Sequence, residues 1–382
     1  MESRPAPPPW RVLFILPDAG MPQTKGYQVR CLEVASALGP RYVTRVIAAR
    51  RSTAVEGLDA GARPLWRFRS LLARLLDGGP LQSALFDGQD VAREAAKVVS
   101  QWQPHAVVIV TERLPVTALA MRGKPLVIDV VDSMRLHMSE RARRSHFPLS
   151  ALWRREASAF RGFSLRLRDA AAAIVVAADT SLADYPDAVV VANAARPSVL
   201  PRPVPTIDVV FTGTLSYWPN LRAALEVCRS IAPRIRSSLP HSRIVVAGKS
   251  PPMELQRACD DAGVELLSSV PDMDEVLRES RLALAPIDWT PGANLKILEA
   301  LAAGTPVLAY SAAAARLPTG ATGVRVCDGA EAMAREAIAI LEGRHRLMVE
   351  DRNRHTWTAR ASDFERVLDQ VIAEAAQAHA GR

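Results

Sequence analysis

The sequence predicts an α/β protein built from two doubly wound domains, and three observations support this fold class. Short runs of β-branched residues alternate with helical patterns, which is typical of parallel sheets covered by helices. The alternation stops at a proline-rich segment and then starts again. The chain has 382 residues, which is too long for one hydrophobic core, since such cores stop growing at about 250–300 residues.

The first half contains six apolar runs that predict buried strands. Helical periodicity separates them, as at Gln28–Leu38 and Val91–Gln101. The predicted strands are Val12–Leu16, Val43–Ala48, Ala106–Val110, Leu126–Val130, Ala173–Val176 and Val189–Val191.

The segment Ala194–Pro205 contains four prolines and is predicted to link the domains. We therefore place an N-terminal domain in residues 1–200, with the helix at 355–378 as a candidate addition to it, and a C-terminal domain in residues 201–354. Ligands of such sheets bind at the carboxyl ends of the strands, so we expect the domains to face each other across a ligand-binding cleft. The second series of strands comprises Asp208–Phe211, Ser242–Ala247, Glu265–Leu267, Leu282–Ala285 and Pro306–Tyr310, with a helix from about Asn220 to Arg236.

Composition indicates an ordinary globular protein, with 49% hydrophobic and 23% charged residues. The four cysteines form no CxxC pair, which favours reduced thiols. The N-terminus has no signal-peptide pattern, and the longest apolar run, Ala170–Ala178, is too short to cross a bilayer. We expect a cytoplasmic protein, with peripheral binding to the inner face of the cytoplasmic membrane as a further expectation.

The net charge of +8 is concentrated in a basic belt between Arg135 and Arg168, where nine arginines and two glutamates give +7. The segment Arg63–Leu76 is also basic and amphipathic. Such segments bind anionic lipid or a polyanion, or they form a solvated face. Because no nucleic-acid module accompanies the charge, we expect no nucleic-acid partner. The residues assigned to the acceptor or membrane side are Arg141, Arg143, Arg144, Arg154 and Arg155.

Lys296 and Glu299 lie in a helix that is otherwise apolar from Leu295 to Ala303. Charged residues are rarely buried without partners, and these two share one helical face. The N-terminus of this helix follows a predicted strand and is an anion site. Lys296 there suits a phosphate, and Glu299 suits a sugar diol. The alternative is an ion pair between the two side chains.

Several stretches resemble the retaining, nucleotide-sugar-dependent glycosyltransferases of family 4, which have the GT-B fold of two Rossmann-like domains. The most specific is "APIDWTPGANLKILEALAAGTPVLA", which is similar to the family's donor-binding signature. "VVFTGTLSYWPNLRAALE", "RIVVAGKSPP", "GVELLSSVPDMDEVL" and "RVLFILPDAGMPQTKGYQVRCLEVASAL" resemble other parts of the same layout. The resemblance implies transfer of a sugar from a UDP- or GDP-sugar to a sugar or lipid-linked acceptor, as in polysaccharide or glycoconjugate precursor synthesis.

The resemblance also implies roles for individual residues. Glu299 holds the ribose hydroxyls, Lys296 faces the diphosphate, and Gly26 closes over the donor. Asp132 stands where relatives have an aspartate next to a histidine. We expect Lys296, Asp132 and Gly26 to be catalytic, and the donor-binding set to comprise Glu299, Asn294, Leu295, Gly292, Gly213, Thr214, Lys249, Val270 and Asp288.

Two positions differ from the family pattern. Pro291 replaces an acid that contacts the transferred sugar, and Val131 replaces the histidine. Two rival functions therefore stay open. One is a UDP-sugar 2-epimerase of the same fold, which would convert UDP-N-acetylglucosamine without an acceptor. The other is a non-catalytic protein that binds a nucleotide sugar or an anionic surface and shows no turnover.

We expect no metal and no cofactor beyond the nucleotide-sugar co-substrate. The motif Asp272-Met-Asp274 is a DxD, but it precedes a predicted helix at Glu275–Arg281 and is interpreted as its N-cap. No HExxH, GxSxG or GxxxxGK[ST] motif is present. Lys296 and the helix N-terminus would stabilise the leaving diphosphate, which is the task that a metal performs elsewhere.

Overall fold

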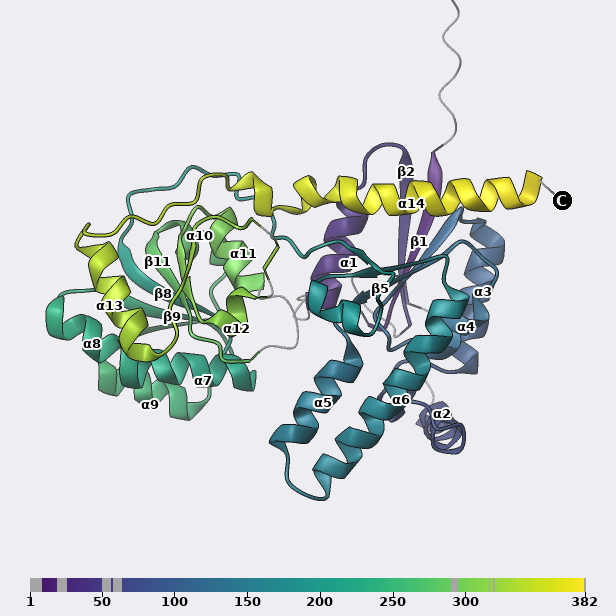
Figure 1. The fold of residues 1–382 in the computed structure, drawn as a ribbon, viewed down its shortest axis with the longest axis horizontal. Coiled ribbons are helices and arrows are strands. Elements are labelled where there is room, and N and C mark those ends of the chain that lie inside the picture. The colour runs from purple at the N-terminus through teal and green to yellow at the C-terminus, as the bar shows by residue number, and fades with distance from the viewer. Residues whose placement is uncertain are drawn as a thin grey trace, which may run out of the picture. The chain divides into compact units, whose positions relative to one another are not determined.

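A computed structural model describes residues 9–18, 26–49, 56–57, 64–289, 295–315, 317–318 and 320–380. The chain divides into two compact units (Figure 1). Unit 1 comprises residues 1–192 together with 361–382, and unit 2 comprises residues 193–360. The proline-rich segment Ala194–Pro205 lies in unit 2, where Ala195 pairs with Thr356.

Unit 1 contains a parallel sheet of seven strands in the described residues, in the order β3-β2-β1-β4-β5-β6-β7. The strands are β1 (Trp10–Leu16), β2 (Tyr42–Ala48), β3 (Glu56–Gly57), β4 (Ala106–Val110), β5 (Leu126–Val131), β6 (Ala173–Val176) and β7 (Val189–Val190). The helices are α1 (Gly26–Ala37), α2 (Pro64–Leu76), η2 (Leu81–Leu85), α3 (Gln89–Trp102), α4 (Pro115–Ala120), α5 (Met134–Arg144), α6 (Leu149–Ala170) and η3 (Asp179–Ala183), with α14 (Trp357–Ala380) crossing from unit 2.

The C-terminal helix α14 packs on unit 1 beside the first two strands. Phe364 contacts Phe14 of β1 with ring centroids 6.2 Å apart. Glu365 accepts a hydrogen bond from the Gly39 amide at 2.7 Å, and Asp369 accepts one from the Tyr42 hydroxyl at 2.5 Å. The last part of the chain is therefore built into the first unit.

Unit 2 contains a parallel sheet of six strands among the described residues, in the order β10-β9-β8-β11-β12-β13. The strands are β8 (Ile207–Thr214), β9 (Ile244–Lys249), β10 (Glu265–Ser268), β11 (Ser280–Ala285), β12 (Val307–Ala309) and β13 (Val324–Val326). The helices are α7 (Trp218–Glu226), η4 (Val227–Ile231), α8 (Ala232–Ser238), α9 (Met253–Ala262), α10 (Met273–Arg278), α11 (Leu295–Ala302), α12 (Ser311–Ala314), α13 (Ala330–Leu341) and η5 (Asn353–His355).

Two predicted helices differ from the structure. The single helix expected at residues 220–236 is divided by η4, a π-helical turn. Pro233 lacks the amide hydrogen that an α-helix needs, and the wider turn before it accommodates this loss. The helix expected at Glu275–Arg281 ends at Arg278, because Ser280 begins the buried strand β11.

Candidate functional site

The candidate donor site of unit 2 lies where the direction of strand order reverses, between β8 and β11. In open parallel sheets, ligands bind beyond the carboxyl ends of the strands at such a switch point. Gly213 and Thr214 end β8, and Asp288 follows β11. The exposed Lys249 ends the next strand, β9, in register with Thr214.

Lys296 points to the end of β8 from the first turn of α11. Its Nζ donates a hydrogen bond to Oδ1 of Asn220 at 2.6 Å and lies 5.7 Å from the centroid of the Phe211 ring. The Asn220 amide nitrogen donates in turn to the Thr214 carbonyl at 3.0 Å. Burial lowers the pKa of Lys296 to about 8, and the charge of Glu299 opposes this shift.

Glycines at the ends of β8 and β9 make room for this contact. A Cβ at Gly213 would lie 2.9 Å from the Asn220 side-chain nitrogen and 3.4 Å from Cε of Lys296. A Cβ at Gly248 would lie 1.8 Å from the Gly213 carbonyl oxygen, which no real side chain tolerates. β9 therefore needs glycine at position 248, whereas a side chain at position 213 would displace Asn220.

Glu299 lies one helical turn after Lys296. Its side chain is exposed to solvent. Nearby protein atoms still displace part of the water around the carboxyl group, and this desolvation raises its pKa. The charges of Lys296 and Arg196 lower this pKa and oppose the shift. Because solvent reaches the carboxyl group, its oxygens are available to accept hydrogen bonds from a ligand.

In the described part of the chain, the other residues predicted to bind the donor form no side-chain hydrogen bond or ion pair with Lys296 or Glu299. Val270 is half-buried and packs against the core of unit 2, and Leu295 begins α11 and packs against a cluster that contains Leu298. Gly292 and Asn294 lie outside the described residues, as does Pro291. The N-cap interpretation of the DxD motif is confirmed, since Asp272 accepts a hydrogen bond from the Asp274 amide at 2.9 Å. Among the described residues, no three acidic, histidine or cysteine side chains gather into a metal-binding group.

In unit 1, Asp132 directly follows β5 and Gly26 begins α1. Val131, just before Asp132, has a φ of 61°, a conformation that is strained for a β-branched residue and is often found at functional sites. Glu112 connects this turn to α6, because it accepts hydrogen bonds from the Met134 amide at 2.6 Å and from the Ser164 hydroxyl at 3.1 Å. The strain singles out this turn as a candidate site.

The basic belt lies on α5 and α6, an antiparallel pair of helices in unit 1 (Figure 1). Arg141, Arg143, Arg144 and Arg154 are exposed. The Arg141 guanidinium stacks over the Trp153 ring at 4.3 Å, while Arg143 and Arg144 each approach Glu140 at 2.5 Å. Arg155 differs, because it donates to the carbonyls of Gly79 and Arg74 and thereby holds the chain around α2 against α6.

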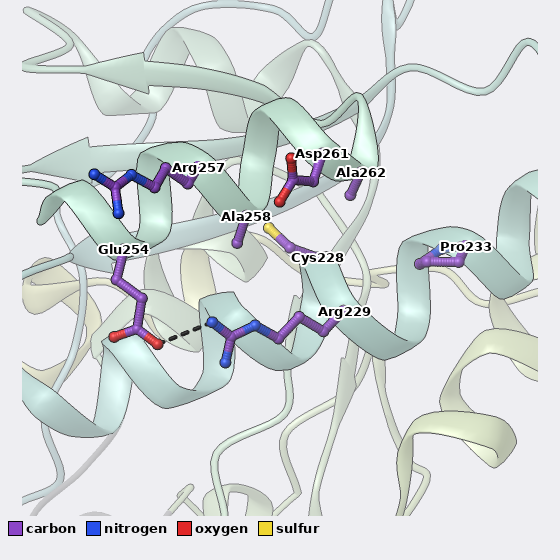
Figure 2. A pocket seen from close by; sticks show the side chains of 8 residues that line it. All are labelled: Cys228, Arg229, Pro233, Glu254, Arg257, Ala258, Asp261 and Ala262. Carbon is purple, nitrogen blue, oxygen red and sulfur yellow. Dashed lines mark hydrogen bonds and ion pairs between the residues drawn. The ribbon is translucent and has the colours of Figure 1, made fainter.

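A separate hollow of about 570 Å³ lies between η4 and α9 in unit 2 (Figure 2). An ion pair between Arg229 and Glu254 at 2.9 Å crosses it, and Cys228, Arg257 and Asp261 also line it. None of the donor-site residues contributes to its lining. We assign no role to this hollow.

Sequence reasoning missed Asn220, which is buried in the first turn of α7. An asparagine near a helix start is read as a local capping residue, and its contact with Lys296 spans 76 positions. The only sequence signal is its place shortly after the glycine turn of β8.

Residues 206–343 match the family described as "Glycosyl transferases group 1". Unit 2 therefore contains a group 1 glycosyltransferase domain. Solved structures show a two-domain GT-B fold for the whole chain. Sucrose-phosphate synthase from Thermosynechococcus elongatus matches with a TM-score of 0.63 and 14% identity over 96% of this chain and 100% of that chain.

Two further solved structures are similar to this chain. HepE of Anabaena, solved in complex with UDP, has a TM-score of 0.56 and 15% identity over 97% of this chain and all of its own. AviGT4, a glycosyltransferase involved in avilamycin A biosynthesis, has a TM-score of 0.54 and 14% identity over 96% of this chain and 98% of its own. No curated protein sequence matches the chain.

Proposed function

We propose that this glycosyltransferase moves a sugar from a nucleoside diphosphate sugar, with UDP or GDP as the nucleotide, to the hydroxyl group of a sugar or lipid-linked acceptor. The observation that carries the proposal is the cation of Lys296, held by Asn220 at the switch point of the sheet with Glu299 one turn away. A cation and the N-terminus of α11 together suit a diphosphate. The structure of HepE with UDP-glucose supports this choice of donor.

In the proposed reaction, the bond between the sugar C1 and the diphosphate oxygen breaks, and the acceptor oxygen bonds to C1 with retention of configuration. The proton of the acceptor hydroxyl passes to the leaving phosphate oxygen. Lys296 stabilises the negative charge that grows on the diphosphate, and Glu299 holds the ribose diol. Asp132 and Gly26 of unit 1 are the other proposed catalytic residues. The acceptor serves polysaccharide or glycoconjugate precursor synthesis in the cytoplasm.

Thermal shift with UDP-, GDP- and dTDP-sugars tests the donor class directly. A ligand at 100 times its dissociation constant stabilises the native state by about 2.7 kcal/mol, which is readily seen. We expect that one of the nucleotides raises the melting temperature of the protein, and that the nucleotide sugars of the same base also do so. If none does so at millimolar concentration, the proposed donor site is wrong.

Nucleotide affinity should fall at alkaline pH. Burial lowers the pKa of Lys296 to about 8, so its charge is fully present well below this pH and is lost as pH rises through it. The bound diphosphate favours the protonated lysine, so UDP or GDP binding should weaken by up to about tenfold per pH unit above pH 8. Isothermal titration at pH 7, 8, 9 and 9.5 measures this, with Lys296→Met as the variant that lacks the dependence. Equal affinity of the native protein at pH 7 and 9.5 would contradict the assignment.

Activity should survive chelation. We propose that Lys296 and the α11 N-terminus supply the positive charge that a metal would otherwise provide, so the rate in EDTA should stay within about threefold of the untreated rate. The measurement is the initial rate of nucleotide release with and without EDTA. Restoration of a lost rate by Mn²⁺ or Mg²⁺ would show that a metal takes part.

We also propose that unit 1 docks on an anionic membrane surface through the α5–α6 hairpin. Phe147 and Leu149 at its tip are 83% and 54% exposed, beside the exposed arginines of the belt. The neighbouring helix α2 presents four more exposed leucines, Leu71, Leu72, Leu75 and Leu76. No helix in the described part of the chain is long and apolar enough to cross a membrane. Apolar side chains flanked by arginines suit the boundary between headgroups and acyl chains.

Phe147→Asp should abolish sedimentation with phosphatidylglycerol vesicles at low salt, because it places a charge where the tip enters the membrane. Binding of the native protein should weaken at 0.5 M salt, since exposed charges are screened over about 10 Å already at 0.1 M. Val199→Asp is the matched control, as Val199 is 86% exposed but lies in unit 2. Equal sedimentation of all three proteins, or equal binding to uncharged vesicles, would show that the hairpin is only a solvated face.

A further inference from the structure

Two tryptophans stack at the switch point of the unit 2 sheet. The rings of Trp218 and Trp289 have centroids 5.5 Å apart and planes 14° from parallel. Trp218 is the first residue of α7, after β8, and Trp289 follows the neighbouring strand β11. Trp218 is 37% exposed and Trp289 is half-buried, so part of the aromatic pair is open to solvent.

A charged pair borders this surface. Nη2 of Arg222 lies 3.2 Å from Oδ2 of Asp288, and both side chains are about half exposed. Arg222 is one helical turn after Trp218, and its guanidinium lies 5.8 Å from the Trp218 ring centroid. A partly exposed aromatic pair, with a guanidinium over one ring and a carboxylate paired to it, complements a pyranose ring, which has an apolar C–H face and a rim of hydroxyl groups.

The surface also adjoins the proposed diphosphate site. Asn220, which accepts the hydrogen bond of Lys296, is two residues after Trp218 in the first turn of α7. Trp218 and Trp289 follow β8 and β11, the two neighbouring strands between which this site lies. A ligand whose phosphates reach Lys296 would therefore carry an attached sugar at the same end of the sheet as the tryptophans.

We propose that Trp218, Trp289, Arg222 and Asp288 form a platform that binds the pyranose ring of a substrate by stacking and hydrogen bonding. The ring belongs either to the donor or to the acceptor. This inference rests on the proposed function, and it names residues that determine which sugar is used. It gives this chain a means of recognising the sugar although Pro291 stands where relatives carry an acid.

The test compares Trp218→Ala and Trp289→Ala with the native protein, and Tyr217→Ala serves as a matched control because Tyr217 is a neighbouring aromatic residue with 39% exposure. Isothermal titration measures UDP against UDP-glucose, and GDP against GDP-glucose. If the donor ring stacks, each tryptophan variant should bind the nucleotide sugar about tenfold more weakly and bind the free nucleotide as before. If the acceptor ring stacks, the loss should appear instead in saturation-transfer NMR of methyl α-glucoside with the UDP-loaded protein.

Asp288→Asn keeps the aromatic surface and so remains informative if a tryptophan variant fails to fold. It should bring the dissociation constants of UDP-glucose and UDP-galactose closer together, because a carboxylate that distinguishes hydroxyl orientation is lost. The platform is refuted if the tryptophan variants change neither the affinity for nucleotide sugar nor the saturation transfer to methyl α-glucoside. It is also refuted if they weaken the binding of free nucleotide as much as that of nucleotide sugar, because a nucleobase would then stack there. Failure of the native protein to bind any nucleotide refutes the proposed function instead. Saturation transfer to methyl α-glucoside without nucleotide, compared between the native protein and the tryptophan variants, then decides the platform.

Discussion

Lys296→Ala is expected to lower turnover by about 100- to 1,000-fold, the usual effect of removing one preorganised donor to developing negative charge. Charge on the diphosphate grows as the bond to the sugar breaks, so the lysine acts more strongly in the transition state than on the bound donor. The affinity for the intact nucleotide sugar should change less than the turnover, whereas free UDP or GDP, whose diphosphate carries the full charge, should bind at least about tenfold more weakly. Single-turnover kinetics at saturating donor measure the chemical step.

Glu299→Ala is the matched variant, on the same face of α11. If Glu299 holds the ribose diol equally before and during reaction, its loss should weaken nucleotide binding by about 1.5–3 kcal/mol and leave the saturated rate nearly unchanged. Neither change should unfold the protein. Glu299 is exposed, and the lowered pKa of Lys296 means that burial disfavours its charge in the folded state. Reduced melting temperatures of both ligand-free variants, with unchanged nucleotide affinity, would instead indicate a structural ion pair.

The two sheets could be predicted because their central strands are covered on both faces and read as continuous apolar runs. Ala106–Val110 and Ala173–Val176 are predicted with their observed bounds. The edge strands β3 and β13 were not predicted, because Glu56–Gly57 and Val324–Val326 contain no continuous apolar run. The π-helical turn at Val227–Ile231 was also missed, since local periodicity does not show how a helix accommodates a proline.

Part of the site could be predicted because a single short segment reveals it. Lys296 and Glu299 are charged residues in an otherwise apolar helix, and this local pattern is unusual. The site was not predictable where partners come from distant segments. Trp218 and Trp289 are brought together because β8 and β11 are neighbours in the sheet. Nothing in either local sequence specifies that pairing, which depends on strand order. The same holds for Asn220 and Lys296.

The strongest predicted effect on stability concerns Arg30 and Asp129 in unit 1. Arg30 of α1 is fully buried, Asp129 of β5 is 2% exposed, and Nε of the arginine lies 2.8 Å from the carboxylate. This pair ties α1, which begins at the candidate catalytic residue Gly26, to the strand that precedes Asp132. Removing one partner of a buried pair leaves an uncompensated charge away from water, which typically costs about 3–5 kcal/mol.

Arg30→Met should therefore lower the free energy of unfolding of unit 1 by about 3–5 kcal/mol. Because the two units need not unfold together, amide hydrogen exchange of peptides that cover β1 and β5 is the suitable measurement, with β8 and β9 as the internal reference in unit 2. Arg93→Met is the matched control, since Arg93 pairs with Asp90 on an exposed helix face, and such pairs contribute less than about 1 kcal/mol. The double variant Arg30→Met with Asp129→Leu should recover most of the loss, because it removes the isolated charge and leaves apolar groups in the core. Equal exchange rates in Arg30→Met and Arg93→Met would show that the buried pair contributes no more than a surface pair, and that apolar packing alone holds α1 on the sheet.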